Sequence, residues 1–263
     1  MPGNPFSAHL GYLFAKLPLE DRFAAARAAG FEAVEHPAPV ALSPDRMRTL
    51  LEATGLKLAQ ITSGMGGAGE KGIASLAGRE TEFRDGYARA LDYAEAVGCP
   101  FVHAMAGVGG DDATYRGNIE AAVRLSEGRA PKVLVEAISH AAVPGYHMAH
   151  VDDLLALARS LPGQISVLID TFHATADGHD PAAAIRAAGS ALGHVHIADH
   201  PGRSEPGTGS VDFPAVLGAL GAAGYRGAIG FEYLPSGPDH LTWLTGWRGM
   251  RDRSNRPSVY GET

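Results

Sequence analysis

The sequence has a single cysteine, few basic residues and no long apolar run, and each shortage excludes a class of protein. Cys99 alone cannot form an intramolecular disulfide, and without a CxxC or Cys/His finger spacing it cannot build a thiolate zinc site. With 22 Lys and Arg against 29 Asp and Glu, the formal net charge is -7, so the chain lacks the concentrated basic surface that neutralises phosphates. We therefore expect no nucleic acid among its partners.

The apolar residues lack the distribution of an exported or membrane protein. The opening residues MPGNPFSAHL have no basic segment followed by a long apolar one, and no later segment reaches the ~18 apolar residues of a membrane span. We expect a cytoplasmic protein without membrane contact. The chain has 263 residues, of which 45% are apolar. At this size it can bury roughly three quarters of its unfolded surface on folding.

Short apolar runs alternate with longer segments of helical period along almost the whole chain. Eight runs have the length and composition of buried strands, at residues 7–14, 32–36, 57–62, 101–106, 133–137, 166–170, 194–199 and 228–233. Strands that are apolar on both faces are typical of parallel sheets covered by helices. Eight such units match a (β/α)8 TIM barrel, which has ~250 residues, so we predict one barrel domain over residues 1–263. An open doubly wound sheet is the alternative, although it usually has only about six strands.

Helical signals fill the intervals between the runs. Ser43 is a candidate N-cap with Pro44 in the first helical position, and Gly55 is a candidate C-terminal stop. Apolar stripes at helical spacing occur at Leu19, Phe23 and Ala26, at Phe83, Tyr87, Leu91 and Ala94, and at Val151, Leu154, Leu155 and Ala158. Each stripe predicts a helix with one buried face. The polar tail from about residue 251 is expected to be loose or, in a homo-oligomer, used in subunit contacts.

The fifth to eighth predicted strands end in residues that can bind a metal. They supply Glu136, Asp170, the pair His194 and His196, and Glu232. Active groups of such barrels lie at the C-terminal strand ends, where neighbouring strands are about 5 Å apart. Taken singly, each acid could be a helix cap and each histidine a buried imidazole bonded to a carbonyl. Together they would be desolvated without a neutralising cation, so we predict a divalent metal site.

The donor set indicates which metal and which histidine. Three carboxylates and one imidazole suit Mg²⁺, Mn²⁺ or Co²⁺ better than they suit a structural zinc. His194 and His196 share a face of their strand because they are two residues apart. If both point into the barrel, only His196, nearer the strand end, should reach the metal.

Further histidines and one arginine fall on or just after the predicted strands. His173 follows Asp170 by three residues, where it could reach substrate oxygens beside the metal. Arg203 carries a planar fork suited to a carboxylate or phosphate, with a surface salt bridge as the alternative. His103 is a candidate substrate contact, with a buried interior imidazole as the alternative. Four more histidines lie on or just after predicted strands, namely His9, His36, His140 and His200.

Several segments resemble the hydroxypyruvate isomerase family, which belongs to the xylose-isomerase-like barrels. They are VLVEAIS, LIDTFH, GHVHIADHPGRSEPGTGSVDF and GFEY, and LEDRFAAARAAGFEAVE and GEKGIASLAGRETEF extend the resemblance over most of the chain. The resemblance implies that Glu136, Asp170, His196 and Glu232 bind the metal and that the two glutamates are the acid/base pair. The family pattern has Gln where this chain has His196, and Asn where it has His200.

The resemblance also implies an activity. It is isomerisation of a small hydroxy-keto acid through an enediolate, with hydroxypyruvate to tartronate semialdehyde as the type case. Arg203 in the family's PGR loop, with Lys71 from the GEKG loop, would pair with the substrate carboxylate, and His173 matches a substrate-contacting histidine of related epimerases. Because His196 is the epimerase-like choice, a ketose 3-epimerase acting on a sugar is an alternative. A dehydratase and a non-catalytic sugar-binding barrel also stay open, whereas the acid excess counts against an abasic-site endonuclease.

Overall fold

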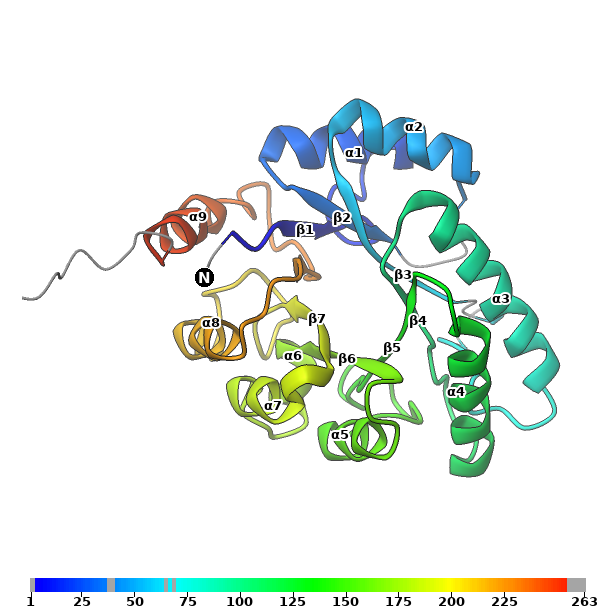
Figure 1. The fold of residues 1–263 in the computed structure, drawn as a ribbon. Coiled ribbons are helices and arrows are strands. Elements are labelled where there is room, and N and C mark those ends of the chain that lie inside the picture. Colours follow the sequence, from blue (N-terminus) through cyan, green and yellow to red (C-terminus); the bar gives the residue numbers. More distant parts are fainter. Residues whose placement is uncertain (1–2, 37–40, 64–65, 68–69, 255–263) are drawn as a thin grey trace, which may run out of the picture.

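The chain folds into a closed barrel of eight parallel strands, each paired with the next and β8 paired with β1 (Figure 1). This computed structural model describes residues 3–36, 41–63, 66–67 and 70–254, with side chains up to residue 250. The strands are β1 (Phe6–His9), β2 (Ala33–His36), β3 (Lys57–Thr62), β4 (Phe101–His103), β5 (Lys132–Glu136), β6 (Ile165–Asp170), β7 (Leu192–Ile197) and β8 (Ile229–Phe231). The TIM barrel prediction is confirmed, and the doubly wound alternative is wrong.

Helices surround the barrel and connect its strands (Figure 1). They are α1 (Leu19–Ala29), α2 (Pro44–Thr54), α3 (Glu80–Val97), α4 (Asp112–Ser126), α5 (Val151–Ser160), α6 (Thr171–Ala176), α7 (Pro181–Ala188), α8 (Phe213–Ala222), α9 (Trp243–Ser254) and the short 3₁₀ helix η1 (Gly189–Ala191). No helix of the described ranges is long and apolar enough to cross a membrane.

The helix boundaries and buried faces follow the sequence signals. Ser43 Oγ accepts a hydrogen bond from the Arg46 amide at 3.3 Å, so it caps α2 as predicted. Gly55 ends the helix in the left-handed region with a φ of 67°. The predicted stripes of α3 and α5 are buried throughout, and in α1 Phe23 and Ala26 are buried beneath a half-buried Leu19.

Five strands end earlier than predicted, and the difference is largest in β1 and β4, where the residues after the strand bond elsewhere. The run 7–14 forms a strand only to His9, whose carbonyl accepts from the amides of Tyr12 at 3.0 Å and Leu13 at 2.9 Å and so turns the chain. The run 101–106 forms a strand only to His103, since the carbonyls of Met105 and Ala106 accept from the amides of residues 74 and 75.

The last helix closes the outside of the barrel beside β1 and β8. Trp243 stacks on Phe231 with ring centroids 4.3 Å apart, and Trp247 lies edge-on to Phe6 at 6.5 Å. The backbone of α9 continues to Ser254, so the predicted polar tail begins as helix, and residues 255–263 lie outside the described part of the chain.

Polar side chains are buried inside the barrel, in contrast to the apolar layer between strands and helices. The set includes Ser7, Glu35, Gln60, Thr62, His103, His194 and His196. Buried polar groups need hydrogen-bond partners or a cation, so these residues are the candidates for a functional site inside the barrel.

Candidate active site

The four residues predicted as metal ligands lie together at the C-terminal end of the barrel. Glu136, Asp170 and His196 are on β5, β6 and β7, and Glu232 follows β8. Each offers one ligand atom, and these atoms all lie within 4.8 Å of one another. The register explains the grouping, since Asp170 pairs with His196 across β6 and β7. All four side chains are buried.

The oxygens of this cluster fit a divalent cation. Asp170 Oδ1 accepts from the amides of Phe172 at 2.7 Å and His173 at 3.1 Å at the start of α6. Its second oxygen, Oδ2, is buried and has no hydrogen-bond partner among the described residues, and the same holds for Glu136 Oε1. A buried carboxylate oxygen without a donor is costly, and a hard divalent ion held by three oxygens and one nitrogen would remove that cost.

Arg203 lies against the same carboxylates. Its Nη2 is 3.0 Å from Glu232 Oε2 and 3.6 Å from Asp170 Oδ2. Its Cζ lies 5.2 Å from the ring centroid of Tyr12 and 5.6 Å from that of Phe172, within the range of cation–π attraction. The guanidinium is therefore fixed at the ligand cluster, and the alternative of a surface salt bridge is wrong.

Three further imidazoles surround the cluster in their neutral form. His9 Nε2 lies 3.6 Å from Glu232 Oε1, and His103 Nδ1 lies 3.7 Å from Glu136 Oε2. His173 lies beside Asp170, and its Nδ1 is 3.1 Å from Ser139 Oγ. Burial lowers the pKa of His9 to about 4, that of His103 to about 3 and that of His173 to about 4. At neutral pH each ring can donate one hydrogen bond and accept another.

The two glutamates are driven toward opposite protonation states. Burial, reinforced by the charges of Glu232 and Asp170 against that of His196, raises the pKa of Glu136 well above its ordinary value. Burial also disfavours the ionised form of Glu232, but the charge of Arg203, with that of His196, outweighs it and holds the pKa of Glu232 well below its ordinary value. Two carboxyl groups with separated pKa values in one cavity can serve as acid and base.

These side chains line one cavity of about 360 Å³. Its walls are His9, Gly11, Tyr12, Gln60, Thr62, Lys71, His103, Met105, Glu136, Ile138, Val143, His173, His196, Arg203 and Glu232. The exposed Lys71 has a φ of 56°, which is uncommon for a residue with a side chain. The structure thus brings all the predicted site residues to one cavity. Seven of them line its wall, and Asp170 contacts the wall residues His196 and Arg203.

Three of the histidines on or after predicted strands lie elsewhere. His140 is exposed, with its Nε2 3.1 Å from the carbonyl oxygen of Tyr146. His36 and His200 are half-buried, and none of the three belongs to the cavity walls. A position near a strand end therefore does not by itself bring a histidine side chain into the cavity at the mouth of the barrel.

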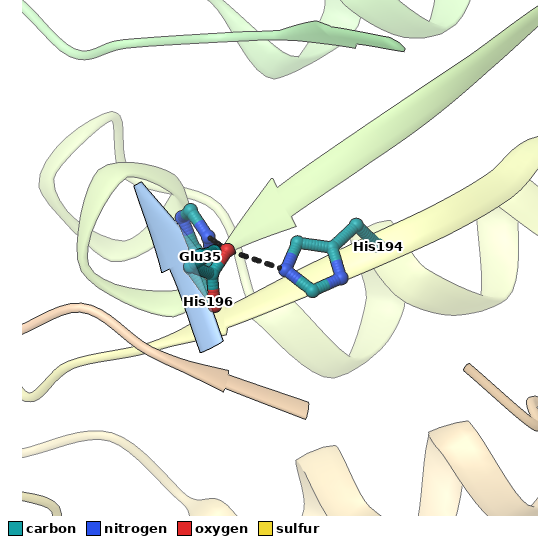
Figure 2. Close-up of side chains that lie close together, drawn as sticks. All are labelled: Glu35, His194 and His196. Atoms are coloured by element: carbon teal, nitrogen blue, oxygen red, sulfur yellow. Dashed lines mark hydrogen bonds and ion pairs between the residues drawn. The ribbon is translucent and has the colours of Figure 1, made fainter. Parts of the chain in front are cut away.

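Sequence reasoning missed Glu35, which lies deeper in the barrel on β2. One oxygen of its buried carboxylate, Oε2, is 2.9 Å from His194 Nε2 and 2.8 Å from His196 Nε2 (Figure 2). Gln60 Nε2 donates to the same oxygen at 3.1 Å. The signal was an acid inside the short strand AVEH, one residue before its end.

Comparisons with known proteins agree with this fold and site. The sequence profile of the family described as "Xylose isomerase-like TIM barrel" matches residues 23–253. The 2-oxo-tetronate isomerase of Cupriavidus necator is 34% identical over 256 residues, covering 93% of this chain and 98% of that protein. The hydroxypyruvate isomerase of Escherichia coli is 30% identical over 255 residues, covering 92% and 99%.

Solved structures give the same result. A crystal structure described as AP endonuclease, family 2, from Brucella melitensis has a TM-score of 0.87 and 33% identity, covering 93% of this chain and 99% of that one. An L-ribulose 3-epimerase has a TM-score of 0.79 at 19% identity, covering 99% and 100%, and supports the fold alone. The resemblance to hydroxypyruvate isomerases is confirmed, and the chain belongs to the xylose isomerase-like TIM barrel family.

Proposed function

We propose that this protein is a metal-dependent isomerase of a small hydroxy-keto acid, such as hydroxypyruvate or a 2-oxo-tetronate. The observation that carries the proposal is the pair of glutamates, Glu136 and Glu232, which face one small cavity with opposite pKa shifts. The names of relatives at 30–34% identity, hydroxypyruvate isomerase and 2-oxo-tetronate isomerase, support the same substrate class. A cavity of about 360 Å³ is near the lower end for ligand sites, which favours a substrate of few atoms.

The cofactor in this proposal is one Mg²⁺, Mn²⁺ or Co²⁺ ion held by Glu136, Asp170, His196 and Glu232. When bound, such an ion supplies positive charge that stabilises oxygen atoms as they become negative in an enediolate. The unpartnered oxygens of Asp170 and Glu136 support this assignment.

The two glutamates move the protons. Glu232, held ionised beside Arg203, takes the proton from the hydroxyl-bearing carbon, and Glu136 delivers a proton to the neighbouring carbon. The hydroxyl proton passes to the former carbonyl oxygen. A proton returning from Glu232 to Glu136 completes the cycle, so the product has the mass of the substrate.

The remaining cavity residues bind and orient the substrate. The guanidinium of Arg203 is fixed between two rings and can pair with the substrate carboxylate, with Lys71 at the rim as a second cation. The neutral rings of His173 and His103 can each donate to one substrate oxygen and accept from another.

A ketose 3-epimerase would use the same metal and the same two acids on a sugar. A dehydratase would lose water, and a binding protein would leave its ligand unchanged. All three differ from the proposal in their products, so one experiment separates them.

The test is a panel assay of the metal-loaded protein in D₂O. Hydroxypyruvate, 2-oxo-tetronates, ketoses and an abasic DNA duplex are offered, and the products are followed by mass spectrometry and proton NMR. We expect aldehyde and keto forms to interconvert, with one solvent deuterium on carbon. Loss of water, epimerisation of a ketose with inert keto acids, incision of DNA or no turnover would contradict the proposal.

The subunit arrangement is also a prediction. We expect a homo-oligomer, and light scattering of the full chain would measure the number of subunits.

A further inference from the structure

Glu35 is a fully buried carboxylate with its hydrogen bonds concentrated on one oxygen. Its exposed fraction is 0%, and its Oε2 is within 2.8 to 3.1 Å of nitrogens on His196, His194 and Gln60. Two donors come from β7 (Figure 2), and the third comes from β3 on a different side of the barrel. A carboxylate held from several strands has a fixed position and is therefore suited to fixing that of a neighbour.

His196 uses its two ring nitrogens on opposite sides. Nε2 faces Glu35 Oε2 at 2.8 Å and is hydrogen-bonded to it. Nδ1 faces the ligand cluster, 2.9 Å from Glu232 Oε2 and 4.0 Å from Asp170 Oδ2, but makes no hydrogen bond within the described residues. An ionised carboxylate can only accept hydrogen bonds, so Nε2 must carry a proton to bond with Glu35. Binding of a metal at Nδ1 requires the neutral imidazole, whose lone pair is then on Nδ1 and points at the predicted metal position.

We infer that Glu35 is a positioning residue, which keeps the proton of His196 on Nε2 and holds Nδ1 toward the metal. The inference rests on the proposed metal site and assigns a role to a residue outside its four ligands. Carboxylates that accept from the second nitrogen of a ligand histidine generally set its tautomer and orientation.

His194 and Gln60 hold Glu35 in turn. Both donate to the oxygen that faces His196, so the carboxylate cannot rotate that oxygen away without losing all three bonds. His194 thereby acquires a function although it lies too deep for the cluster. Gln60 on β3 and His194 on β7 thus hold Glu35 on β2, and Glu35 in turn holds the predicted metal ligand His196.

The neighbouring strand β8 leaves space for this arrangement through Gly230, which pairs with His196 across β7 and β8. A Cβ atom at this position would lie 2.5 Å from Glu35 Oε1, 2.7 Å from His196 Cδ2 and 2.8 Å from His194 Nε2. All three distances are shorter than van der Waals contact. Glycine is therefore the residue that lets the carboxylate and both imidazoles meet inside the barrel.

The same three residues could instead hold a second metal ion, because Glu35, His194 and His196 also offer ligand atoms within 4.8 Å of one another. The O–N separations of 2.8 and 2.9 Å argue for hydrogen bonds. A metal would lie about 2.0 to 2.2 Å from each donor and would push the nitrogens away from the oxygen. The number of ions bound per chain distinguishes the two arrangements.

The first test measures Mn²⁺ binding by calorimetry on the full chain. Glu35→Gln keeps the shape of the side chain but removes its negative charge and replaces one of its two acceptor oxygens by an NH₂ donor. We expect one ion per wild-type chain and an affinity about 10- to 100-fold weaker in Glu35→Gln. The matched control is Glu205→Gln, another buried carboxylate, whose Oε1 accepts from the Ser236 amide at 2.7 Å, and we expect its affinity to be unchanged.

The outcomes separate this inference from the proposed function. Wild-type protein without affinity for Mn²⁺ would refute the metal site itself. Wild-type binding with an equal affinity in Glu35→Gln would refute the role of Glu35 alone, and two ions per chain would favour the second metal site. Thermal unfolding of the metal-free variants checks that each is folded.

The second test uses wild-type protein and does not depend on the folding of a Glu35 variant. Protein with ¹⁵N-labelled histidine is loaded with diamagnetic Zn²⁺, which binds such donor sets more tightly than Mn²⁺ does. Two-bond ¹H–¹⁵N spectra report which nitrogen carries the proton, and His196→Gln identifies the signal. We expect the proton on Nε2 and the metal on Nδ1. A proton on Nδ1 would overturn the inference.

Discussion

Replacing Gly230 by alanine should damage the barrel interior through one added methyl group. The new Cβ would be 2.5 Å from Glu35 Oε1 and 2.7 Å from His196 Cδ2. Both neighbours are buried and hydrogen-bonded to each other's side chains, so neither can move freely. Overpacking of this kind costs about 1 to 3 kcal/mol, and we expect Gly230→Ala to lower the free energy of unfolding by that amount.

Gly218 provides the matched control. It lies in α8, is exposed, and an added Cβ would meet nothing within 4 Å. Alanine in a helix interior is more favourable than glycine by up to about 1 kcal/mol, so Gly218→Ala should leave stability equal or higher. Urea unfolding followed by circular dichroism measures both variants. If Gly230→Ala were as stable as the wild type and bound Mn²⁺ equally well, the packing argument around Glu35 would be refuted.

Three further predictions concern the site and one surface pair. Glu136→Gln and Glu232→Gln should each lower kcat by about 10²- to 10⁴-fold with little change in thermal unfolding, and full turnover in either would contradict the acid/base pair. Arg203→Lys keeps the charge but loses the planar fork, so KM for a keto acid should rise about 10-fold or more in steady-state assays, whereas an unchanged KM would remove Arg203 from carboxylate binding. At the surface, the hydrogen bond that His150 Nδ1 donates to the Asp177 carboxylate raises the pKa of His150, so its stabilising contribution is present at low pH and is lost as pH rises through the folded-state pKa. The difference in urea midpoint between wild type and His150→Gln should therefore be larger at pH about 5.5 than at about 9, and a constant difference would contradict the ion pair.

The sequence predicted the barrel and the meeting of the four proposed ligands because both depend on simple periodicity. The proposed ligands Glu136, Asp170 and Glu232 each stand where an apolar run meets a loop, and in a parallel barrel such ends share one rim. His196 was preferred over His194 by counting residues along the strand. The observed contacts agree, since His196 lies at the cluster and His194 lies one layer below.

The failures have two physical origins, contacts between distant segments and local turns that a run of apolar residues does not reveal. Glu35 is inside a strand, so attention to strand ends alone missed it, and its partners lie 159 and 161 residues away in sequence. Tyr12 was assigned to a strand, and the turn bonds to the His9 carbonyl that bring it to the cavity have no marker in a run of apolar residues. His36, next to Glu35 on β2, shows that one step along a strand moves a side chain to the other face.

The most direct test of the account is a crystal structure of the protein grown with Mn²⁺, with the anomalous signal of manganese recorded. The account predicts a single strong peak bound by carboxylate oxygens of Glu136, Asp170 and Glu232 and by Nδ1 of His196. A peak elsewhere, a second peak between Glu35 and His194, or no peak at a saturating concentration would contradict it.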